Sequence, residues 1–290
     1  MQSVSLTIGL AMGAALLFSI GNHVSKRALN YADSPTVTLY QIGTATLIYW
    51  LASPFFMQVA YWLTPAVIIL ALIGLFRPLL SANLGTAGTR ILGPTISSTL
   101  SASGPIVGVT LGVIWFGESL PWQSVAGTAG IVTAVVVLSW RGQTKSSWPA
   151  IALLLPLGAA LVRAVTHGFT KFGMETIPSP LFVALVSYSV SLPLALLYDR
   201  MRGTRVVHKS IPIRVLALMT TSGSLYALAV FLLNTALLHG DLVVVSPIIA
   251  CTPFFTLILG IWVFNEANID VRTVAAVGLV VPSVILIGLR

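Results

Sequence analysis

The sequence predicts an all-α integral membrane protein whose ten transmembrane helices form two inverted five-helix repeats. Three observations carry this prediction. The composition is membrane-like, with 57% apolar residues, 8% charged residues and a mean hydropathy of +0.98, whereas soluble domains have about 25% charged residues. Ten apolar runs are long enough to cross a bilayer, and blocks of the first half recur in the second. Because the chain is this apolar, its net charge of +8 indicates membrane topology and not a nucleic-acid partner.

The ten predicted spans lie between charged or Pro/Gly/Ser-rich breaks, and each supplies most of the roughly 20 apolar residues that a spanning helix needs. They cover about 4–25, 36–57, 64–87, 95–116, 121–140, 149–170, 180–198, 212–236, 242–264 and 272–289. The first run has no basic leader and no clean small-residue cleavage site, so we expect it to remain as a helix. Proline pairs predict breaks in the fourth span, at Pro94 and Pro105, and in the ninth, at Pro247 and Pro253. No segment is left for a soluble domain.

The distribution of basic residues predicts how the spans are oriented. Eleven Lys and Arg residues fall in one set of alternate loops: Lys26, Arg27, Arg90, Arg141, Lys145, Arg200, Arg202, Arg205, Lys209, Arg214 and Arg272. The other set holds only Lys171 and Arg290. Cytoplasmic loops carry the excess of basic residues, so we expect a multi-pass protein of the bacterial inner membrane with both termini in the periplasm. All seven tryptophans lie near span ends, where amphipathic rings anchor a helix at the interface.

An internal repeat divides the chain into residues 1–142 and 143–290. Gly13–Pro35 matches Gly158–Pro180 at seven of 23 positions, and Ala102–Glu118 matches Ala250–Glu266 at six of 17. Each copy contains five spans, and an odd number makes the second copy enter the membrane from the opposite face. Inverted repeats of this kind build a central substrate site that can open to either side.

Both halves contain the pattern P-x-x-x-x-x-x-G-x-x-x-x-x-E, from Pro105 to Glu118 and from Pro253 to Glu266. In this pattern and in its ten spans, the chain resembles the drug/metabolite transporter superfamily, and within it the EamA-like exporters. The resemblance covers essentially the whole chain. It implies ten helices around a central cavity lined by spans 1, 3, 4, 6, 8 and 9, and it implies a transporter and not an enzyme. Relatives carry amino acids, drugs, nucleotide sugars and other metabolites, so the family leaves the substrate open.

Two arginines lie inside predicted spans, Arg77 in the third and Arg163 in the sixth. An arginine at the bilayer centre costs about 2.5–3.5 kcal/mol on insertion scales, so it normally faces a cavity or a partner. All seven acidic residues lie in loops or at span ends, which leaves no carboxylate at this depth. A guanidinium binds carboxylate, phosphate or sulfonate oxygens bidentately. We therefore expect Arg77 and Arg163 to bind an anionic or carboxylate-bearing substrate; hydrogen bonds to backbone carbonyls freed by Pro78 or Pro156 are the structural alternative.

Further polar residues extend the predicted substrate site. Arg163, His167 and Lys171 share one face of the sixth span, and the repeat places Phe18, Asn22 and Lys26 on the equivalent face of the first. The two lysines either extend a basic path or reach the headgroups. In the eighth span, Tyr226 and Asn234 are the remaining candidates, because a buried amide is costly without a partner. The predicted substrate-binding set is Arg77, Arg163, His167, Asn22, Tyr226 and Asn234.

The function expected from these residues is export or exchange of a small anionic metabolite by a secondary, alternating-access transporter. The first span contains no acid, unlike that of the proton-driven small multidrug-resistance relatives, and an inside-negative potential drives an anion outward. Export of zwitterionic or aromatic amino acids or other neutral metabolites, with structural arginines, is one alternative. A passive channel is another. An intramembrane lipid-modifying enzyme is more remote, because the chain has no G-x-S-x-G and no intramembrane Asp pair.

Expected partners are the small-molecule substrate and the lipid bilayer, with no cofactor, no metal and no nucleic acid. The one cysteine, Cys251, lies in an apolar run and is expected to serve packing. A monomer is expected, since one chain already contains both repeats.

Overall fold

The computed structural model describes residues 2–101, 103–139, 149–202, 211–263 and 271–289, and every regular element in these ranges is a helix. The first half contains six α-helices: α1 (Gln2–Ala28), α2 (Ser34–Ala52), α3 (Ala66–Phe76), α4 (Leu79–Ser101), α5 (Gly104–Phe116) and α6 (Trp122–Ser139). Two short 3-10 helices, η1 (Ser53–Phe55) and η2 (Val59–Leu63), join α2 to α3.

The second half begins with a third 3-10 helix, η3 (Ala150–Leu153). Its α-helices are α7 (Leu154–Thr176), α8 (Pro180–Met201), α10 (Ile213–His239), α11 (Leu242–Ile249), α12 (Thr252–Trp262) and α13 (Val271–Gly288).

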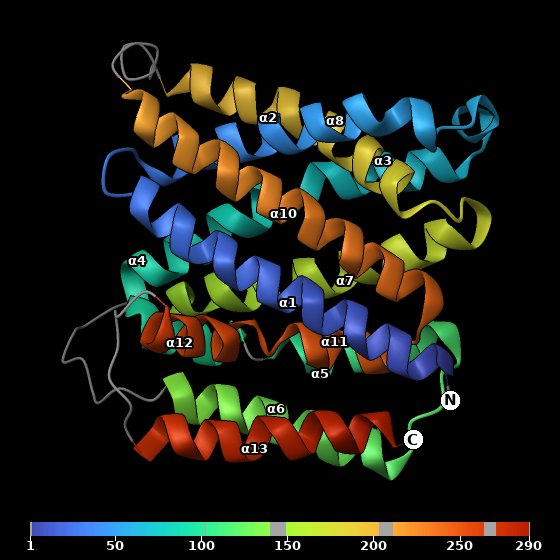
Figure 1. Ribbon diagram of the computed structural model, residues 1–290, viewed down its shortest axis with the longest axis vertical. Coiled ribbons are helices and arrows are strands. Elements are labelled where there is room, and N and C mark those ends of the chain that lie inside the picture. Colours follow the sequence, from blue (N-terminus) through green and yellow to red (C-terminus); the bar gives the residue numbers. More distant parts are fainter. Residues whose placement is uncertain (1, 102, 140–148, 203–210, 264–270, 290) are drawn as a thin grey trace.

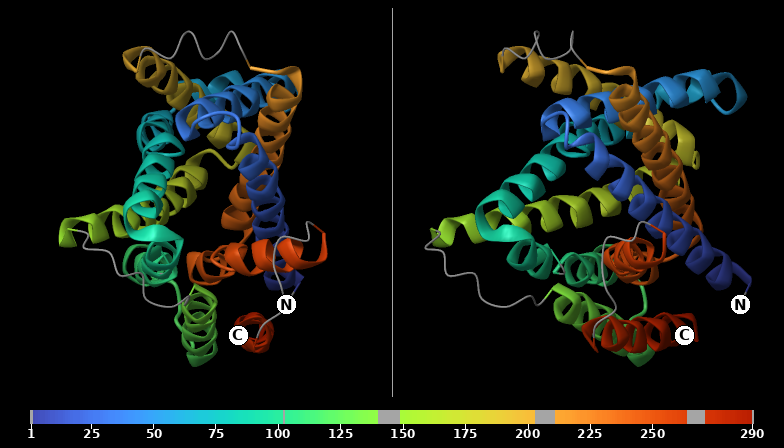
Figure 2. Two further views of the ribbon diagram at one scale, coloured as in Figure 1. Left: turned by 90° about the vertical axis from the view of Figure 1, so that its left-hand side faces the viewer. Right: turned by 60° about the vertical axis from the view of Figure 1, so that its left-hand side comes forward.

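The long helices lie across the molecule in Figure 1, and both chain ends are on the right of that view. We call this the terminal side, and the opposite side, where α1, α6, α8 and α12 end, the basic side. The helices α1 and α7, which the internal repeat aligns, run in opposite directions (Figure 1). Figure 2 shows α1, α4, α7, α10 and α12 surrounding the middle of the molecule, whereas α6 and α13 pack together at one edge.

Six segments of the described chain are long and apolar enough to span a membrane: Val4–Ala28, Ala66–Gly85, Ile151–Thr176, Pro180–Met201, Ile213–His239 and Leu242–Trp262. Gly104–Phe116, Trp122–Val137 and Gly278–Gly288 are shorter apolar helices. A helical membrane protein is therefore confirmed, while the count of ten spans stays a prediction.

The third and fourth spans differ from the sequence prediction. The third span is found as the apolar segment Ala66–Gly85, but its helix is interrupted: α3 ends at Phe76 and Arg77 is extended, with φ −133° and ψ 134°. The residue before a proline is disfavoured in the α region, and Pro78 follows. The expected loop between residues 87 and 95 is wrong, because α4 is helical from Leu79 to Ser101. Glycines in this stretch favoured the prediction of a loop, but a helix tolerates isolated glycines at a modest cost in stability.

The predicted breaks are confirmed at Pro105 and Pro253, whereas those at Pro94 and Pro247 are wrong, because these prolines lie inside α4 and α11. A first break separates α4 from α5, and Pro105 is in the first turn of α5. A second separates α11 from α12, and Pro253 is in the first turn of α12. Proline lacks the N–H that would continue the preceding helix, so its position fixes where each new helix begins.

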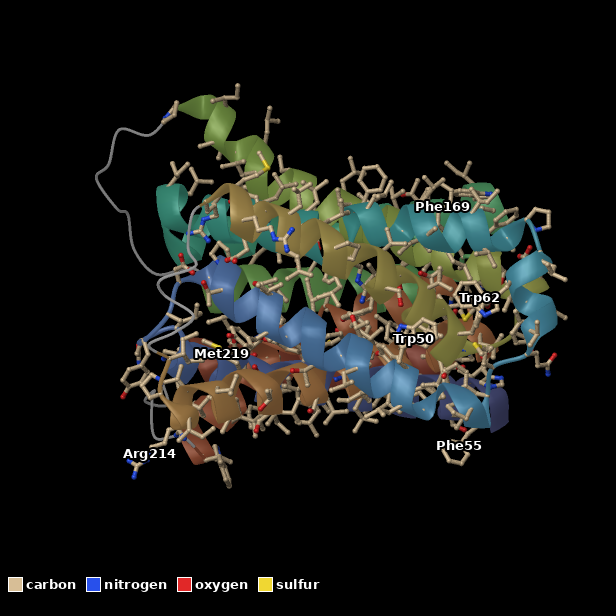
Figure 3. All side chains as sticks on the ribbon, turned by 90° about the horizontal axis from the view of Figure 1, so that it is seen from above. Trp50, Phe55, Trp62, Phe169, Arg214 and Met219 are labelled. Carbon is tan, nitrogen blue, oxygen red and sulfur yellow. The ribbon has the colours of Figure 1, made fainter. Side chains whose placement is uncertain are left out.

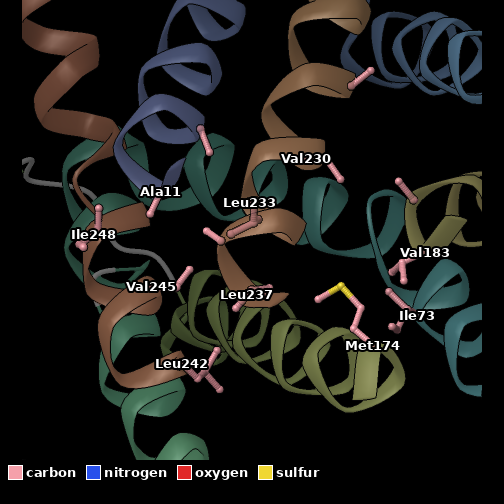
Figure 4. Packing of buried hydrophobic residues seen from close by; sticks show 14 of the residues in the cluster. Ala11, Ile73, Met174, Val183, Val230, Leu233, Leu237, Leu242, Val245 and Ile248 are labelled. Atoms are coloured by element: carbon pink, nitrogen blue, oxygen red, sulfur yellow. The ribbon is translucent and has the colours of Figure 1, made fainter. Parts of the chain in front are cut away.

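Buried hydrophobic side chains from several helices form one cluster (Figure 4). Met174 of α7 lies beside Ile73 of α3 and Val183 of α8, whereas Leu233 and Leu237 follow one face of α10. Lipid tails are as apolar as these side chains, so van der Waals packing, not exclusion of water, stabilises such contacts in a membrane.

The ends of the helices carry the residues expected at a membrane interface. Trp50 at the end of α2 stacks on Trp62, with ring centroids 6.4 Å apart, and Figure 3 places Arg214 at the opposite side. Two tryptophans, Trp140 and Trp148, lie outside the described residues. So do four of the basic-loop residues (Arg141, Lys145, Arg205 and Lys209) and, from the other set, Arg290. The described tryptophans agree with an anchoring position at helix ends.

Candidate functional site

A cavity of about 690 Å³ lies where the helix breaks meet. Its wall includes residues beside the breaks between α3 and α4, between α4 and α5, and between α11 and α12. The middle of α7 and the second half of α1 also contribute. The lining residues are Phe18, Asn22, Arg77, Gly85, Ser101, Gly104, Pro105, Val135, Ala160, Arg163, Ala164, His167, Leu233, Ser246, Ile249, Ala250, Thr252, Pro253 and Thr256. A cavity of this volume holds a small metabolite.

Arg77 reaches the cavity because α3 stops one residue before it. The break is held in place by a tight crossing of α3 and α8, where a Cβ on Gly74 would lie 2.4 Å from the Ser187 carbonyl oxygen. The Ser191 hydroxyl also donates to the Gly74 carbonyl oxygen over 2.8 Å. Arg77 therefore follows by three residues a glycine that is closely packed against α8.

Arg163 and His167 line the cavity from α7, one helical turn apart on the same face. His167 is buried, and Arg163 is partly buried. Within the described part of the chain, Arg77, Arg163 and His167 have no hydrogen-bond or ion-pair partner for their side chains. No acidic residue is among those that line the cavity, so the two guanidinium charges repel each other across it.

Two helix N-termini also meet the cavity wall. Gly104 and Pro105 begin α5, Thr252 and Pro253 begin α12, and no side chain caps either helix. The N-terminal end of a helix carries partial positive charge, which favours an anion nearby. The helix dipoles and the two arginines therefore both make the electrostatic potential in the cavity positive.

Asn22 and Tyr226 form a pair between α1 and α10. The Tyr226 hydroxyl donates to Asn22 Oδ1 over 2.8 Å, and its ring lies 6.0 Å from that of Phe18. Asn22 and Phe18 line the cavity, whereas Tyr226 stands behind them and does not. Asn22 is exposed, in contrast to the buried His167, so the cavity opens near Asn22, toward the basic side.

Asn234 is buried but lies away from this cavity. Its amide nitrogen donates to the Pro180 carbonyl oxygen over 3.1 Å, which ties α10 to the first turn of α8. The structure therefore brings four of the six predicted residues to one wall, with Tyr226 behind it and Asn234 in a helix contact.

Lys171, the next basic residue on the same face of α7, has acidic partners. Its ammonium lies 2.5 Å from Glu118 Oε1 and 3.7 Å from Asp241 Oδ1. Lys171 is therefore occupied by carboxylates, unlike Arg163 and His167. The pairing joins residues 53 positions apart, which the helical spacing of α7 alone did not reveal.

The sequence did not single out Ser246 and Thr256, which also line the cavity. Ser246 packs against Gly108, where an added Cβ would lie 1.9 Å from its hydroxyl oxygen. Thr256 receives a hydrogen bond from Ser19, and its carbonyl oxygen lies 2.8 Å from His23 Nε2. Thr256 follows Thr252 by one helical turn, and this spacing is the signal that could have identified it.

Comparisons with known proteins identify a family and a fold. The model of the EamA-like transporter family matches residues 5–140 and again residues 150–289. A solved structure, described as the crystal structure of a protein, superposes with a TM-score of 0.81 over 97% of this chain and 96% of that chain. Its sequence is 15% identical, so the likeness shows the fold alone. No curated protein sequence matches the chain.

Proposed function

Because the chain belongs to the EamA-like transporter family, we propose that it is a secondary transporter that binds a small anionic or carboxylate-bearing metabolite between Arg77 and Arg163. The observation that carries the proposal is the charge of the cavity. Two guanidinium groups face it, no carboxylate lines it, and neither arginine has a described partner. An anion supplies the missing charge and accepts the bidentate hydrogen bonds of guanidinium groups.

Alternating access is proposed as the transport mechanism. The opposite directions of α1 and α7 support inverted repeats, and broken helices at the centre are typical of transporters built this way. The cavity opens near Asn22 and becomes buried toward His167, which agrees with a state open to the basic side only.

Export is the proposed direction. If the basic side is cytoplasmic, as the excess of Lys and Arg predicts, an inside-negative potential contributes about 2.3 kcal/mol per charge per 100 mV to outward movement of an anion. The proposal includes a bacterial inner-membrane location, periplasmic termini and a monomer.

The alternative substrate is a zwitterionic or aromatic amino acid or another neutral metabolite. Phe18 on the cavity wall, with the Tyr226 ring behind it, favours an aromatic group beside a carboxylate. If the arginines are structural, they must hydrogen-bond to backbone carbonyls when the protein is empty.

A thermal-shift screen of the purified protein tests the proposal. The panel holds phosphates, sulfonates, carboxylates, amino acids and organic cations, applied to the parent, Arg77→Ala, Arg163→Ala and the control Arg214→Gln. A ligand that binds only the native state raises the melting temperature. We expect anions to stabilise the parent and the control but neither cavity variant. Equal stabilisation of all four proteins by neutral compounds or cations would contradict an arginine-bound anion.

A further inference from the structure

Glu118 connects the two repeats on the terminal side of the cavity. Its carboxylate accepts hydrogen bonds from the backbone N–H groups of Leu242 and Val243, each over 2.8 Å, at the start of α11. Its side chain is only 4% exposed. The N-cap residue of α11, Asp241, makes no capping hydrogen bond there, so Glu118 of the first repeat satisfies this helix end of the second.

The turn after α5 brings Glu118 to this position. Gly117 has φ +63°, a left-handed conformation that glycine adopts without steric cost, and the Glu118 N–H donates to the Gly112 carbonyl oxygen over 3.0 Å. The carboxylate then lies so close to α5 that a Cβ on Gly112 would be 2.5 Å from Glu118 Oε2.

Lys171 adds α7 to the same contact. Its ammonium binds Glu118, donates to the Gly240 carbonyl oxygen over 3.1 Å, and lies 5.2 Å from the centre of the Phe116 ring. The lysine side chain is 17% exposed. Loss of Lys171 alone would leave the buried Glu118 carboxylate with only the two N–H groups of α11, and an uncompensated buried charge destabilises a protein.

The ion pair lies directly beyond the closed end of the cavity. Lys171 follows His167 by four residues, about 6 Å along α7, on the face that carries Arg163. Leu111 and Phe116 pack against Gly168 of α7, between the cavity and the lysine. Gly240, which accepts from Lys171, also adjoins Thr7 near the start of α1. The contact therefore lies between Arg163 and the terminal side along this face of α7.

We propose that the Lys171–Glu118 ion pair is the gate on the terminal side, and that Lys171 is a second anion-binding position which becomes available when a substrate anion replaces Glu118. This inference rests on the proposed function for its anion. Replacement of one carboxylate by another anion keeps Lys171 neutralised throughout, which lowers the energetic cost of opening compared with simple separation of the pair. Glu118 meanwhile retains the N–H groups of α11 as partners.

Cysteine accessibility tests the gate without any substrate. Cys251→Ser removes the single cysteine, and Ala164→Cys places a new one on the cavity wall. The protein is labelled with a membrane-impermeant maleimide in vesicles of each orientation, and Gln2→Cys in a parallel sample reports which side the reagent reaches. With the pair intact, we expect position 164 to react from the basic side and to be protected from the terminal side.

The test variant is Glu118→Gln with Lys171→Gln, because both charges of the buried pair disappear together, and Asp241, which loses Lys171 as a neighbour, is 37% exposed to water. We expect labelling from the terminal side to become at least about tenfold faster, because a state open to that side changes from a minor to a major population. The matched control, Asp33→Asn with Arg202→Gln, removes the ion pair on the basic side and should not change labelling from the terminal side. A double variant that melts earlier but stays protected would overturn the gate and leave a purely structural pair.

A second arm separates the gate from the substrate class. Inorganic phosphate, sulfate and citrate are added to the parent and to Lys171→Gln, with chloride as the reference. We expect one of these anions to speed labelling from the terminal side in the parent only. If the double variant opens but no anion acts on the parent, replacement of Glu118 by an anion is wrong while the gate stands. If anions give thermal shifts but the double variant stays closed, the proposed function survives and the gate does not.

Discussion

Arg77 and Arg163 place two like charges in one cavity, although each would be more stable beside a carboxylate. A site that awaits a charged ligand is commonly less stable when it is empty, because the groups that bind the ligand repel one another in its absence. In this protein we expect the bound substrate anion to offset the repulsion between the two guanidinium groups. The arginines should therefore lower stability and raise affinity at the same time.

This trade-off predicts the effect of Arg163→Met, which keeps most of the side-chain volume but removes the charge. The ligand-free variant should melt several degrees higher than the parent, since about 1 kcal/mol corresponds to roughly 2–4 °C in a chain of 150–250 residues. It should also lose the thermal shift with anions. Thermal unfolding in detergent, with and without the stabilising anion, measures both effects. A lower melting temperature without ligand would mean that Arg163 holds the fold together.

Individual residues also show what could be predicted from the sequence. The depth of Arg77 and Arg163 in apolar runs was enough to expect both beside a cavity, which they line, because an arginine inside a bilayer needs a polar environment. The same reasoning could not distinguish Asn234, which bonds to Pro180, from Asn22, which lines the cavity. Both are polar residues in apolar helices, and their roles depend on which neighbouring helix faces them.

At the scale of helices, the breaks and close crossings position the site. Prolines predicted the breaks before α5 and α12, since a missing N–H acts locally. The end of α3 at Phe76 was not predicted, although Pro78 was visible in the sequence. A proline inside an apolar run can either kink a helix or end it. Here α3 ends two residues before Pro78, where it crosses α8.

The crossing of α3 and α8 predicts that Gly74→Ala will destabilise the protein. The added Cβ would lie 2.4 Å from the Ser187 carbonyl oxygen and 2.7 Å from Val190 Cβ, so the two helices must separate. We expect a loss of about 1–3 kcal/mol, typical of overpacking, and weaker anion binding because Arg77 follows on the same support. Gly43→Ala in α2 is the control, since its Cβ meets only Leu192 Cδ1, at 3.8 Å.

Thermal unfolding and anion titration of the two glycine variants check this prediction. The control should be neutral or slightly more stable, because alanine favours a helix over glycine by about 0.5–1 kcal/mol. Equal behaviour of Gly74→Ala and Gly43→Ala would show that the α3–α8 crossing does not support the site.

On the basic side, an ion pair between Asp33 and Arg202 joins the start of α2 to the end of α8. Burial raises the pKa of the Asp33 carboxyl, but hydrogen bonds from Arg202 and Thr36 outweigh it, so the pKa lies below its usual value. The hydrogen bond that Arg202 donates to the Asp33 carboxylate raises the pKa of Arg202. Because the folded state prefers the carboxylate, this contribution to stability is present above the unfolded pKa and is lost as the pH falls through the folded value.

Asp33→Asn tests this pH dependence, because asparagine can still cap α2 while the charge is gone. At neutral pH the variant should be less stable by at most about 1 kcal/mol, since the pair is partly exposed. The difference in melting temperature between parent and variant should shrink below about pH 4. A difference that is unchanged from pH 7 to pH 3 would exclude the carboxylate as its source.

For the whole molecule, the resemblance to the EamA-like family was visible in the sequence, and the family model matches residues 5–140 and 150–289. Repetition of blocks is visible without structure, because it depends only on residue identity. The sequence did not show that α4 continues through residues 87–95, where a loop was expected. Hydropathy alone does not mark where one apolar helix ends and the next begins. The Lys171–Glu118 contact was equally hidden, because it forms only when α5, α7 and α11 meet.

The orientation of the molecule connects the site to its proposed direction of transport. The termini lie on one side, and the cavity opens toward the other. A cytoplasmic basic side would therefore load the anion from inside the cell, with the Lys171–Glu118 pair closing the way out.

Transport by the purified protein in proteoliposomes tests the central claim most directly. The vesicles are loaded with the anion that gives the largest thermal shift, and entry of the same anion, isotopically labelled, is followed under an inside-positive potential. The parent and Arg214→Gln should take up the label, whereas Arg77→Gln and Arg163→Gln should lose at least about tenfold in apparent affinity, since a hydrogen bond to a charged group contributes about 1.5–3 kcal/mol. Uptake by both cavity variants with the affinity of the parent would contradict an anion held between Arg77 and Arg163.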